Sequence, residues 1–130
     1  LLSAWKPATS PADPVGHSLI GAFDGNSLSK WSPKADGTEQ HLVVDLGSVQ
    51  KIKRCETFTD FVDKGAQYKI EYSADHIKWS VFADKTNNAK ISIPCFADEG
   101  NAKARWVRLT VLPAKDKTIA NIYEFKVYGD

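Results

Sequence analysis

The sequence predicts an all-β domain built as an antiparallel sandwich or jelly roll. Two observations support this class: short apolar segments alternate with polar residues at a period of two, and residues of turn chemistry separate the segments. No stretch shows a convincing amphipathic helical pattern. A chain of 130 residues is long enough for one substantial core, so we expect a single domain over residues 1–130.

Three strands are predicted between residues 42 and 73. Leu42–Leu46 is a short apolar run that stops at Gly47, and Gln50–Thr57 follows as the second strand. Over Tyr68–Ser73 aromatic and aliphatic residues alternate with polar ones, which is typical of a half-buried strand. Before these strands, Leu19–Phe23 is compatible with a single helical turn.

The second half continues the pattern and brings the total to seven or eight short strands. The further predicted strands are Trp79–Phe82, Lys90–Pro94, Trp106–Val111 and Ile122–Tyr128. The polar, mostly Gly-, Pro- or Asn-containing segments between strands are predicted to be loops: Lys6–Val15, Ser32–Gln40, Thr59–Ala66, Asp84–Asn88, Ala97–Lys103 and Pro113–Ile119.

Composition disfavours several classes of protein. The net charge of +1 gives no electrostatic reason to expect nucleic acid or a membrane as partner. No apolar run approaches the roughly 18 residues of a membrane span, and no signal peptide is visible. Because the chain contains no methionine, we expect a processed product or a module excised from a larger protein. Cys55 and Cys95 fit no metal spacing; we favour buried thiols, with a disulfide as the alternative in an exported chain.

Two oxygen-rich segments far apart in the sequence point to a cation site. Asp24–Trp31 begins with a tight Asp-Gly-Asn turn and ends on a large aromatic residue. Glu124 lies on the last predicted strand. If the two segments meet, one Asp, one Glu, a hydroxyl and backbone carbonyls would suit a hard cation such as Ca²⁺. An Asp-Gly-Asn turn alone is usually only a turn.

Five sequence pieces in order resemble the coagulation factor 5/8 type C (discoidin-like) superfamily, and most closely its family 32 carbohydrate-binding modules. The pieces are Ala22–Asn26 with Ser29–Trp31, Gln40–Gly47, Tyr68–Asp75 with Trp79, Ala104–Leu109, and Ile122–Gly129. The resemblance covers residues 18 to 129. It implies an eight-stranded antiparallel jelly-roll β-sandwich, galactose-binding-domain-like, with a structural calcium ion.

The resemblance also implies which residues would hold calcium. These are the Asp24 and Glu124 carboxylates, the Ser29 hydroxyl, and the carbonyls of Gly21, Asn26 and Tyr123. Ser29 stands where the family most often has Thr, which preserves the oxygen. A cation at this place would tie the first turn of the domain to its final strand.

In such modules sugars bind to variable loops at one end of the sandwich, here Ser32–Gln40, Phe58–Gln67, Asp84–Asn88 and Pro113–Ile119. Recognition needs an aromatic face and planar polar groups. The candidate carbohydrate-binding residues are Phe61, Asp60, Lys64, Trp5, Lys34 and Glu39. Each aromatic residue has a structural alternative: Phe61 covers the end of the sheet, and Trp5 packs across the sandwich.

Two further expectations concern the aromatic residues and the kind of sugar. Trp31, Trp79 and Trp106 stand at the family's structural aromatic positions and are assigned to packing. Galactose-binding members commonly present a His and an Arg in two of the loops, and this chain has Lys34, Glu39, Asp60 and Lys64 there instead. These lysines raise the hypothesis of an acidic sugar.

Catalysis has little support in the sequence, so the chain is not expected to be an enzyme itself. It shows no GxSxG, HExxH or P-loop pattern, and the carboxylate pairs Asp60/Asp63 and Asp98/Glu99 are expected by chance among 16 acidic residues. We expect a secreted, cell-surface or periplasmic carbohydrate-binding module, monomeric in isolation, that targets a glycan-active parent enzyme. The alternative is a discoidin-type adhesion or lipid- or protein-binding domain.

Overall fold

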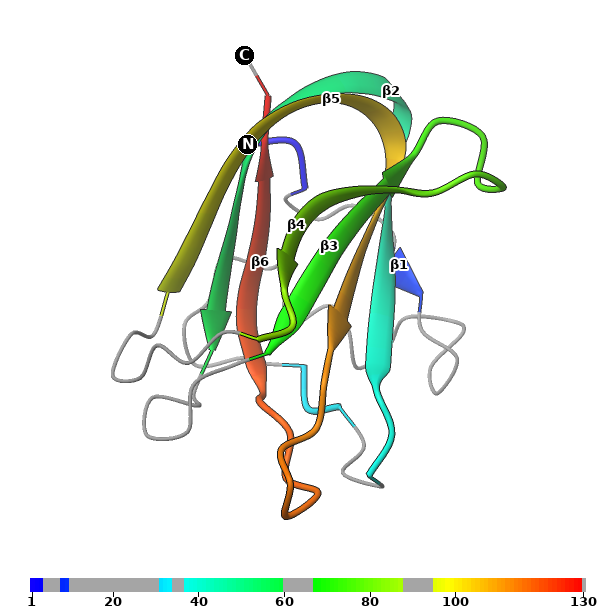
Figure 1. The fold of residues 1–130 in the computed structure, drawn as a ribbon. Helices are drawn as coiled ribbons and strands as arrows, with labels where there is room; N and C mark the ends of the chain where they lie inside the picture. Colours follow the sequence, from blue (N-terminus) through cyan, green and yellow to red (C-terminus); the bar gives the residue numbers. More distant parts are fainter. Residues whose placement is uncertain (4–7, 10–30, 34–36, 60–66, 88–94, 130) are drawn as a thin grey trace.

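The computed structural model describes residues 1–3, 8–9, 31–33, 37–59, 67–87 and 95–129, and these residues form an all-β fold without a helix (Figure 1). All strand pairings are antiparallel, and they join the strands in the order β1-β2-β5-β3-β4, with β6 paired to β2. The strands are β1 (Ala8–Thr9), β2 (Gln40–Thr59), β3 (Tyr68–Ser73), β4 (Ser80–Lys85), β5 (Cys95–Val111) and β6 (Ile122–Tyr128). The predicted fold class is confirmed; the described residues form six strands, and the predicted count of eight is not confirmed.

Two long strands, β2 and β5, create the two layers. They pair along most of their length and arch together over one end of the molecule (Figure 1). The second half of β2 pairs with β6, whereas the second half of β5 pairs with β3. Strand β6 therefore lies on one side of the arch, and β3 and β4 lie on the other.

The bend in β2 occurs where the sequence predicts a strand to stop. Gly47 has φ +89°, a left-handed conformation that a residue with a Cβ rarely adopts. Its N–H donates to Asp45 Oδ1 at 2.8 Å, and the register with β5 shifts between Asp45 and Gln50. The two strands predicted on either side of Gly47 are therefore one bent strand, because pairing with β5 resumes after the irregularity.

The predicted loop Ala97–Lys103 is wrong, because this segment belongs to β5. Its partner is the second half of β2, with Cys55 opposite Asp98 and Lys51 opposite Lys103. Ala102 and Ala104 are buried while Lys103 between them is exposed, so the period of two persists inside a polar stretch. Pairing with a long neighbour outweighs the low strand propensity of Asp, Gly, Asn and Lys here.

Other predicted boundaries shift by one to three residues, and Ala8–Thr9, predicted inside the loop Lys6–Val15, forms β1. Gln40 and Thr59 belong to β2, and Asp84–Lys85 belong to β4, although all four were predicted in loops. Trp79 comes immediately before β4. The predicted strand Lys90–Pro94 and the helical turn Leu19–Phe23 lie outside the described residues.

The core lies between the two layers. Its largest fully buried side chains come from β2, β3, β5 and β6: Tyr68, Phe125, Leu42, Ile52, Ile70, Leu109, Ile122, Val44, Val107 and Val111. Trp31 joins them at 3% exposure, as predicted. Trp79 and Trp106 are only half-buried, so the packing assignment holds fully for Trp31 alone.

Both cysteines are free thiols, and the disulfide alternative is not realised. Cys55 on β2 is buried, and Cys95 at the start of β5 is half-buried. Burial raises the pKa of the Cys55 thiol, so it stays protonated and packs as a small apolar side chain. Within the described residues no helix is long and apolar enough to cross a membrane.

Candidate functional site

Described parts of two predicted sugar-binding loops lie at the same end of the molecule. The segment before β2 and the turn after β5 both lie at the end opposite the arch of β2 and β5 (Figure 1). A Cβ built on Gly37 would be 3.4 Å from the Cγ and Cδ atoms of Lys117, so the two segments are in close contact. We call this the loop end.

The turn at residues 113–118 is held by its own hydrogen bonds. Ala114 N–H donates to Thr118 C=O at 2.7 Å, and Thr118 donates to Asp116 Oδ1 through both its N–H and its hydroxyl. Lys117 has φ +70°, which places it in the left-handed region. A backbone hydrogen bond and the Asp116 carboxylate therefore fix the turn, and Lys115 and Lys117 remain exposed.

Of the predicted sugar-binding residues, Glu39 alone is described. It is exposed and comes immediately before β2 at the loop end, beside the contact between Gly37 and Lys117. An exposed carboxylate at this place can accept hydrogen bonds from ligand hydroxyls. The other candidates lie outside the described residues: Trp5, Lys34, Asp60, Phe61 and Lys64.

Two of the six predicted calcium ligands, Tyr123 and Glu124, are described. Glu124 is 9% exposed and Tyr123 is half-buried, both near the start of β6. The N–H of Trp31 donates to the carbonyl of Ile122, and the reverse bond is also made, both at 2.8 Å. The other four predicted ligands lie outside the described residues: Gly21, Asp24, Asn26 and Ser29.

The carboxylate pair Asp98/Glu99 does not form a site for glycoside hydrolysis. The two residues are consecutive in β5, so their side chains point to opposite faces. Asp98 is buried and accepts from the Tyr68 hydroxyl at 2.5 Å, while exposed Glu99 pairs with Arg54 at 2.9 Å. Hydrolysis requires two carboxylates that flank one bond, and these two cannot do so.

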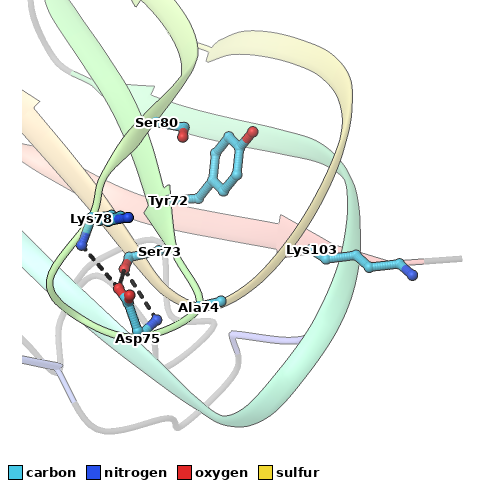
Figure 2. A pocket seen from close by; sticks show the side chains of 7 residues that line it. All are labelled: Tyr72, Ser73, Ala74, Asp75, Lys78, Ser80 and Lys103. Carbon is cyan, nitrogen blue, oxygen red and sulfur yellow. Dashed lines mark hydrogen bonds between the residues drawn. The ribbon is translucent and has the colours of Figure 1, made fainter.

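A pocket lies at the opposite end, beside the turn that joins β3 to β4 (Figure 2). It is a shallow pocket of about 200 Å³. We call it the hairpin pocket and define it by its lining: Tyr72, Ser73, Ala74, Asp75, Lys78, Ser80 and Lys103. Lys103 comes from the arched part of β5, so the pocket lies between the β3–β4 hairpin and the arch.

Side-chain caps hold the turn that borders the pocket. Asp75 Oδ1 accepts from the N–H groups of Ile77 and Lys78, both at 2.9 Å, and from the Ser73 hydroxyl at 3.1 Å. These donors, the Lys78 N–H first, lower the pKa of Asp75 below its ordinary value. His76 adopts φ +64°, and its N–H donates to Ser73 Oγ at 2.8 Å.

Five side chains on the outer face brace the same hairpin, in what we call the Arg–Trp–His ladder: Arg105, Trp106, His76, Trp79 and Arg108. The guanidinium of Arg105 lies 4.6 Å from the Trp106 ring centre, and Trp106 stacks on His76 at 4.9 Å and 14°. His76 meets Trp79 edge-on at 5.7 Å, and Arg108 covers Trp79 at 4.2 Å.

Carboxylates anchor both ends of the ladder. Asp45 pairs with Arg105 at 2.7 Å, and Glu71 pairs with Arg108 at 3.0 Å. The hydrogen bond from Arg105 is the main cause that lowers the pKa of Asp45. The half-burial of both tryptophans follows from this arrangement, since cations cover their outer faces.

Sequence reasoning missed the hairpin pocket and the ladder. Trp106 and Arg108 alternate with the core residues Val107 and Leu109, which marks them as outward-facing. Their position opposite the β3–β4 turn depends on the pairing of β3 with β5, which no local pattern specifies. Lys103 was missed because its segment was predicted to be a loop.

The antiparallel sandwich and the grouping of loops at one end define a class of β-sandwich binding domains. The sequence profile of the F5/8 type C domain matches residues 7–125. The chain therefore belongs to the F5/8 type C domain family. The comparison with curated proteins gives no match.

Solved structures similar to this chain include modules that accompany glycan-active enzymes. Chitosan-binding module 2 of a chitosanase/glucanase from Paenibacillus sp. IK-5, in complex with chitotriose, has a TM-score of 0.82 at 23% identity, covering 99% of this chain and 100% of that one. Module 1 of the same enzyme has a TM-score of 0.79 at 25% identity, covering 98% of each chain. CpGH89CBM32-6 from Clostridium perfringens has a TM-score of 0.80 at 20% identity, covering 95% of this chain and 92% of that one.

Proposed function

We propose that this F5/8 type C domain is a non-catalytic carbohydrate-binding module that attaches a glycan-active enzyme to its substrate. The observation that carries the proposal is the similarity over 98% of both chains to a chitosan-binding module at 25% identity. A second such module was solved with chitotriose bound. As an accessory domain, the chain acts outside the cell or at its surface.

The sugar binds at the loop end in this proposal. Glu39 and the 113–118 turn supply exposed polar groups on a backbone that local hydrogen bonds hold in place. The candidates outside the described residues, Phe61 with Asp60 and Lys64, together with Trp5 and Lys34, complete the site. The expected affinity of one shallow site is micromolar to millimolar, on the order of −8 to −4 kcal/mol. Avidity from the parent protein then adds to retention on a polymer.

The direct test is a glycan screen with the isolated chain. The panel contains galactosides, N-acetylhexosamines, mannosides, uronates and chitosan oligosaccharides, read by glycan array and affinity electrophoresis. Binding to at least one class is expected, with loss in Phe61→Ala and retention in the control Lys69→Gln. Binding to none of these, together with binding to anionic liposomes, would establish the lipid-binding alternative instead.

A structural calcium ion is the second part of the proposal. Glu124 and the Tyr123 carbonyl would hold it with Gly21, Asp24, Asn26 and Ser29. Two observations support the fit: Glu124 is a nearly buried carboxylate, and the Trp31–Ile122 bridge lies two residues from both Ser29 and Glu124. When bound, the ion would be coordinated by carboxylate and carbonyl oxygens, which are the ligands that Ca²⁺ prefers.

Thermal unfolding with and without chelator tests the calcium site. The melting temperature of the chain is expected to fall in excess EDTA and to recover on addition of Ca²⁺, because a ligand that binds only the folded state stabilises it. Glu124→Gln should melt at the same temperature under both conditions. A wild-type melting temperature that EDTA leaves unchanged, in a preparation without bound metal, would contradict the proposal.

A further inference from the structure

The hairpin pocket has an aromatic wall that other side chains hold in place. Figure 2 shows the Tyr72 ring projecting into the space between Ser80 on β4 and Lys103 on β5. Phe82 supports this ring in an edge-on contact at 6.5 Å and 86°. Gly100 makes room for Phe82, since a Cβ there would lie only 2.7 Å from the Phe82 ring. The half-buried Tyr72 ring therefore presents a fixed apolar surface at the pocket.

Charge in the pocket favours an anionic ligand. Lys78 and Lys103 contribute two ammonium groups, and neither makes an ion pair within the described residues. The one carboxylate, Asp75, already accepts three hydrogen bonds through Oδ1. Lys103 extends outward at the rim in Figure 2, and its flexible stem allows the ammonium to approach a bound group.

Polar groups near the ring match the hydroxyls of a sugar. The exposed Ser80 hydroxyl can donate and accept, and Asp75 Oδ2 is available as an acceptor. The volume of about 200 Å³ is below the range typical for drug-sized ligands, so the pocket has room for a single small ring.

We propose that the hairpin pocket is a second binding site, which takes one sugar unit carrying a carboxylate or sulfate group. The Tyr72 ring contacts the apolar face of the sugar, Lys78 and Lys103 hold its anionic group, and Ser80 and Asp75 bind hydroxyls. The inference rests on the proposed glycan-binding function and adds to it, since the loop end remains the first site.

The location of this site gives the module two separate points of attachment. Strand β3 runs from Tyr68, beside the loop end, to Ser73 at the pocket. Leu112 N–H donates to the carbonyl of Gln67 at 2.9 Å, which ties the beginning of β3 to the turn at the loop end. Five residue steps separate the two ends of β3 by roughly 17 Å. Two acidic polysaccharide chains, or two segments of one, can then bind the same module and increase its avidity.

The test is an amide NMR titration of the full chain with trigalacturonate, its neutral methyl ester, galactose 6-sulfate and inorganic sulfate. Chemical shift changes are expected at residues 72–80 and 103 with trigalacturonate or galactose 6-sulfate. The methyl ester should bind the pocket about tenfold more weakly, because it lacks the charge that both lysines contact. Inorganic sulfate should bind about tenfold more weakly as well, because it offers no surface to Tyr72.

Three variants separate the contributions. Lys78→Gln/Lys103→Gln should lose the shifts at residues 72–80, while Lys69→Gln/Lys126→Gln, with the same change of net charge, should keep them. Tyr72→Ala should weaken sugar binding and leave the binding of inorganic sulfate unchanged, and its amide spectrum reports directly whether it folds.

Two results would overturn the inference on its own. One is binding of acidic sugars with shifts only at residues 37–39 and 113–118, which would leave the proposed function intact. The other is equal affinity of the pocket for inorganic sulfate and the acidic sugars, which would identify a bare anion site. If no sugar of any kind binds the chain, the proposed function fails together with this inference.

Discussion

The two ends of the sandwich are stabilised in different ways. At the loop end, left-handed residues and local hydrogen bonds hold the chain: Gly37 at φ +83°, Lys117 at φ +70°, the backbone bonds from Ala114 to Thr118 and from Lys117 to Ala114, and the bonds that Asp116 accepts from Thr118. At the hairpin end, side chains of the Arg–Trp–His ladder brace the β3–β4 turn from outside. A loop end fixed through its backbone leaves side chains at the surface, where they can vary with the ligand. At the hairpin end, the aromatic and basic side chains of the ladder are instead engaged with one another and stabilise the fold.

Among the variants that test this difference, Trp106→Ala is expected to lose the most stability. Trp106 contacts both Arg105 and His76, so its removal eliminates a cation–π contact and a ring stack. We expect a loss of about 2 kcal/mol in the free energy of unfolding, measured by urea denaturation. Trp106→Phe should restore part of the lost stability.

At the loop end, Asp116→Ala removes two exposed hydrogen bonds and should lose about 1 kcal/mol or less in the free energy of unfolding. Equal losses at both ends would contradict the distinction.

Gly100→Ala should have the next largest effect, by overpacking the aromatic wall of the hairpin pocket. The added Cβ would lie 2.7 Å from Phe82 Cε2, so the Phe82 ring must move and Tyr72 with it. A loss of about 1–2 kcal/mol is expected, with shifted ring-proton resonances of Tyr72 in the NMR spectrum. Unchanged Tyr72 resonances would show that Phe82 does not position this ring.

Gly37→Ala tests the backbone control of the loop end. A residue with a Cβ at φ +83° is strained, which should cost about 1 kcal/mol. Gly47→Ala is the matched control, because Gly47 has φ +89° and no neighbouring atom within 4 Å of an added Cβ. Both variants should lose similar stability by urea denaturation, and Gly37→Ala should additionally shift the amides of residues 114–118. A Gly37→Ala variant as stable as the wild type would contradict the account.

The smallest expected effect is a loss of folding stability at low pH that originates at the hairpin end. The pKa of Asp75 is lowered by backbone N–H donors, that of Lys78 first, and the pKa of Asp45 by the Arg105 hydrogen bond. Because the folded pKa values lie below the unfolded ones, the stabilisation is present above the ordinary carboxyl pKa of about 3.9. It is lost as the pH falls through the lowered values.

Urea midpoints measured from pH 6 downward to about pH 2 check this dependence. The wild type should lose stability below about pH 4, and Asp75→Asn and Asp45→Asn should each lose less over the same range. If both variants instead lose as much stability in acid as the wild type, these carboxylates are not bonded more strongly in the folded state than in the unfolded state.

The fold class was predictable because the period of two is a local signal. It identified the core face of Tyr68–Ser73 and of Ile122–Tyr128, whose bounds agree with β3 and β6. The predicted strand end at Gly47 was wrong, because β2 bends there and continues to Thr59 through its pairing with β5. The loop predicted at Ala97–Lys103 failed because its strand conformation depends on β2, some 45 residues earlier in the chain.

The functional residues were less predictable for a physical reason. A sugar site needs side chains from several loops, and their proximity depends on the whole fold rather than on spacing. Glu39 was identified from its loop position, and it is exposed at the loop end. The hairpin pocket instead joins Tyr72, on an alternating strand, with Lys103 from the arched part of β5. Neither residue has a local signature of binding.

The most direct test of the central claim is to map where a neutral oligosaccharide from the glycan screen binds the chain. Amide NMR titration should shift residues 37–39 and 113–118 and leave residues 50–56 in the middle of β2 unchanged. Shifts confined to the middle of β2, or the absence of binding by any oligosaccharide in the panel, would contradict the account of a glycan-binding module whose first site is the loop end.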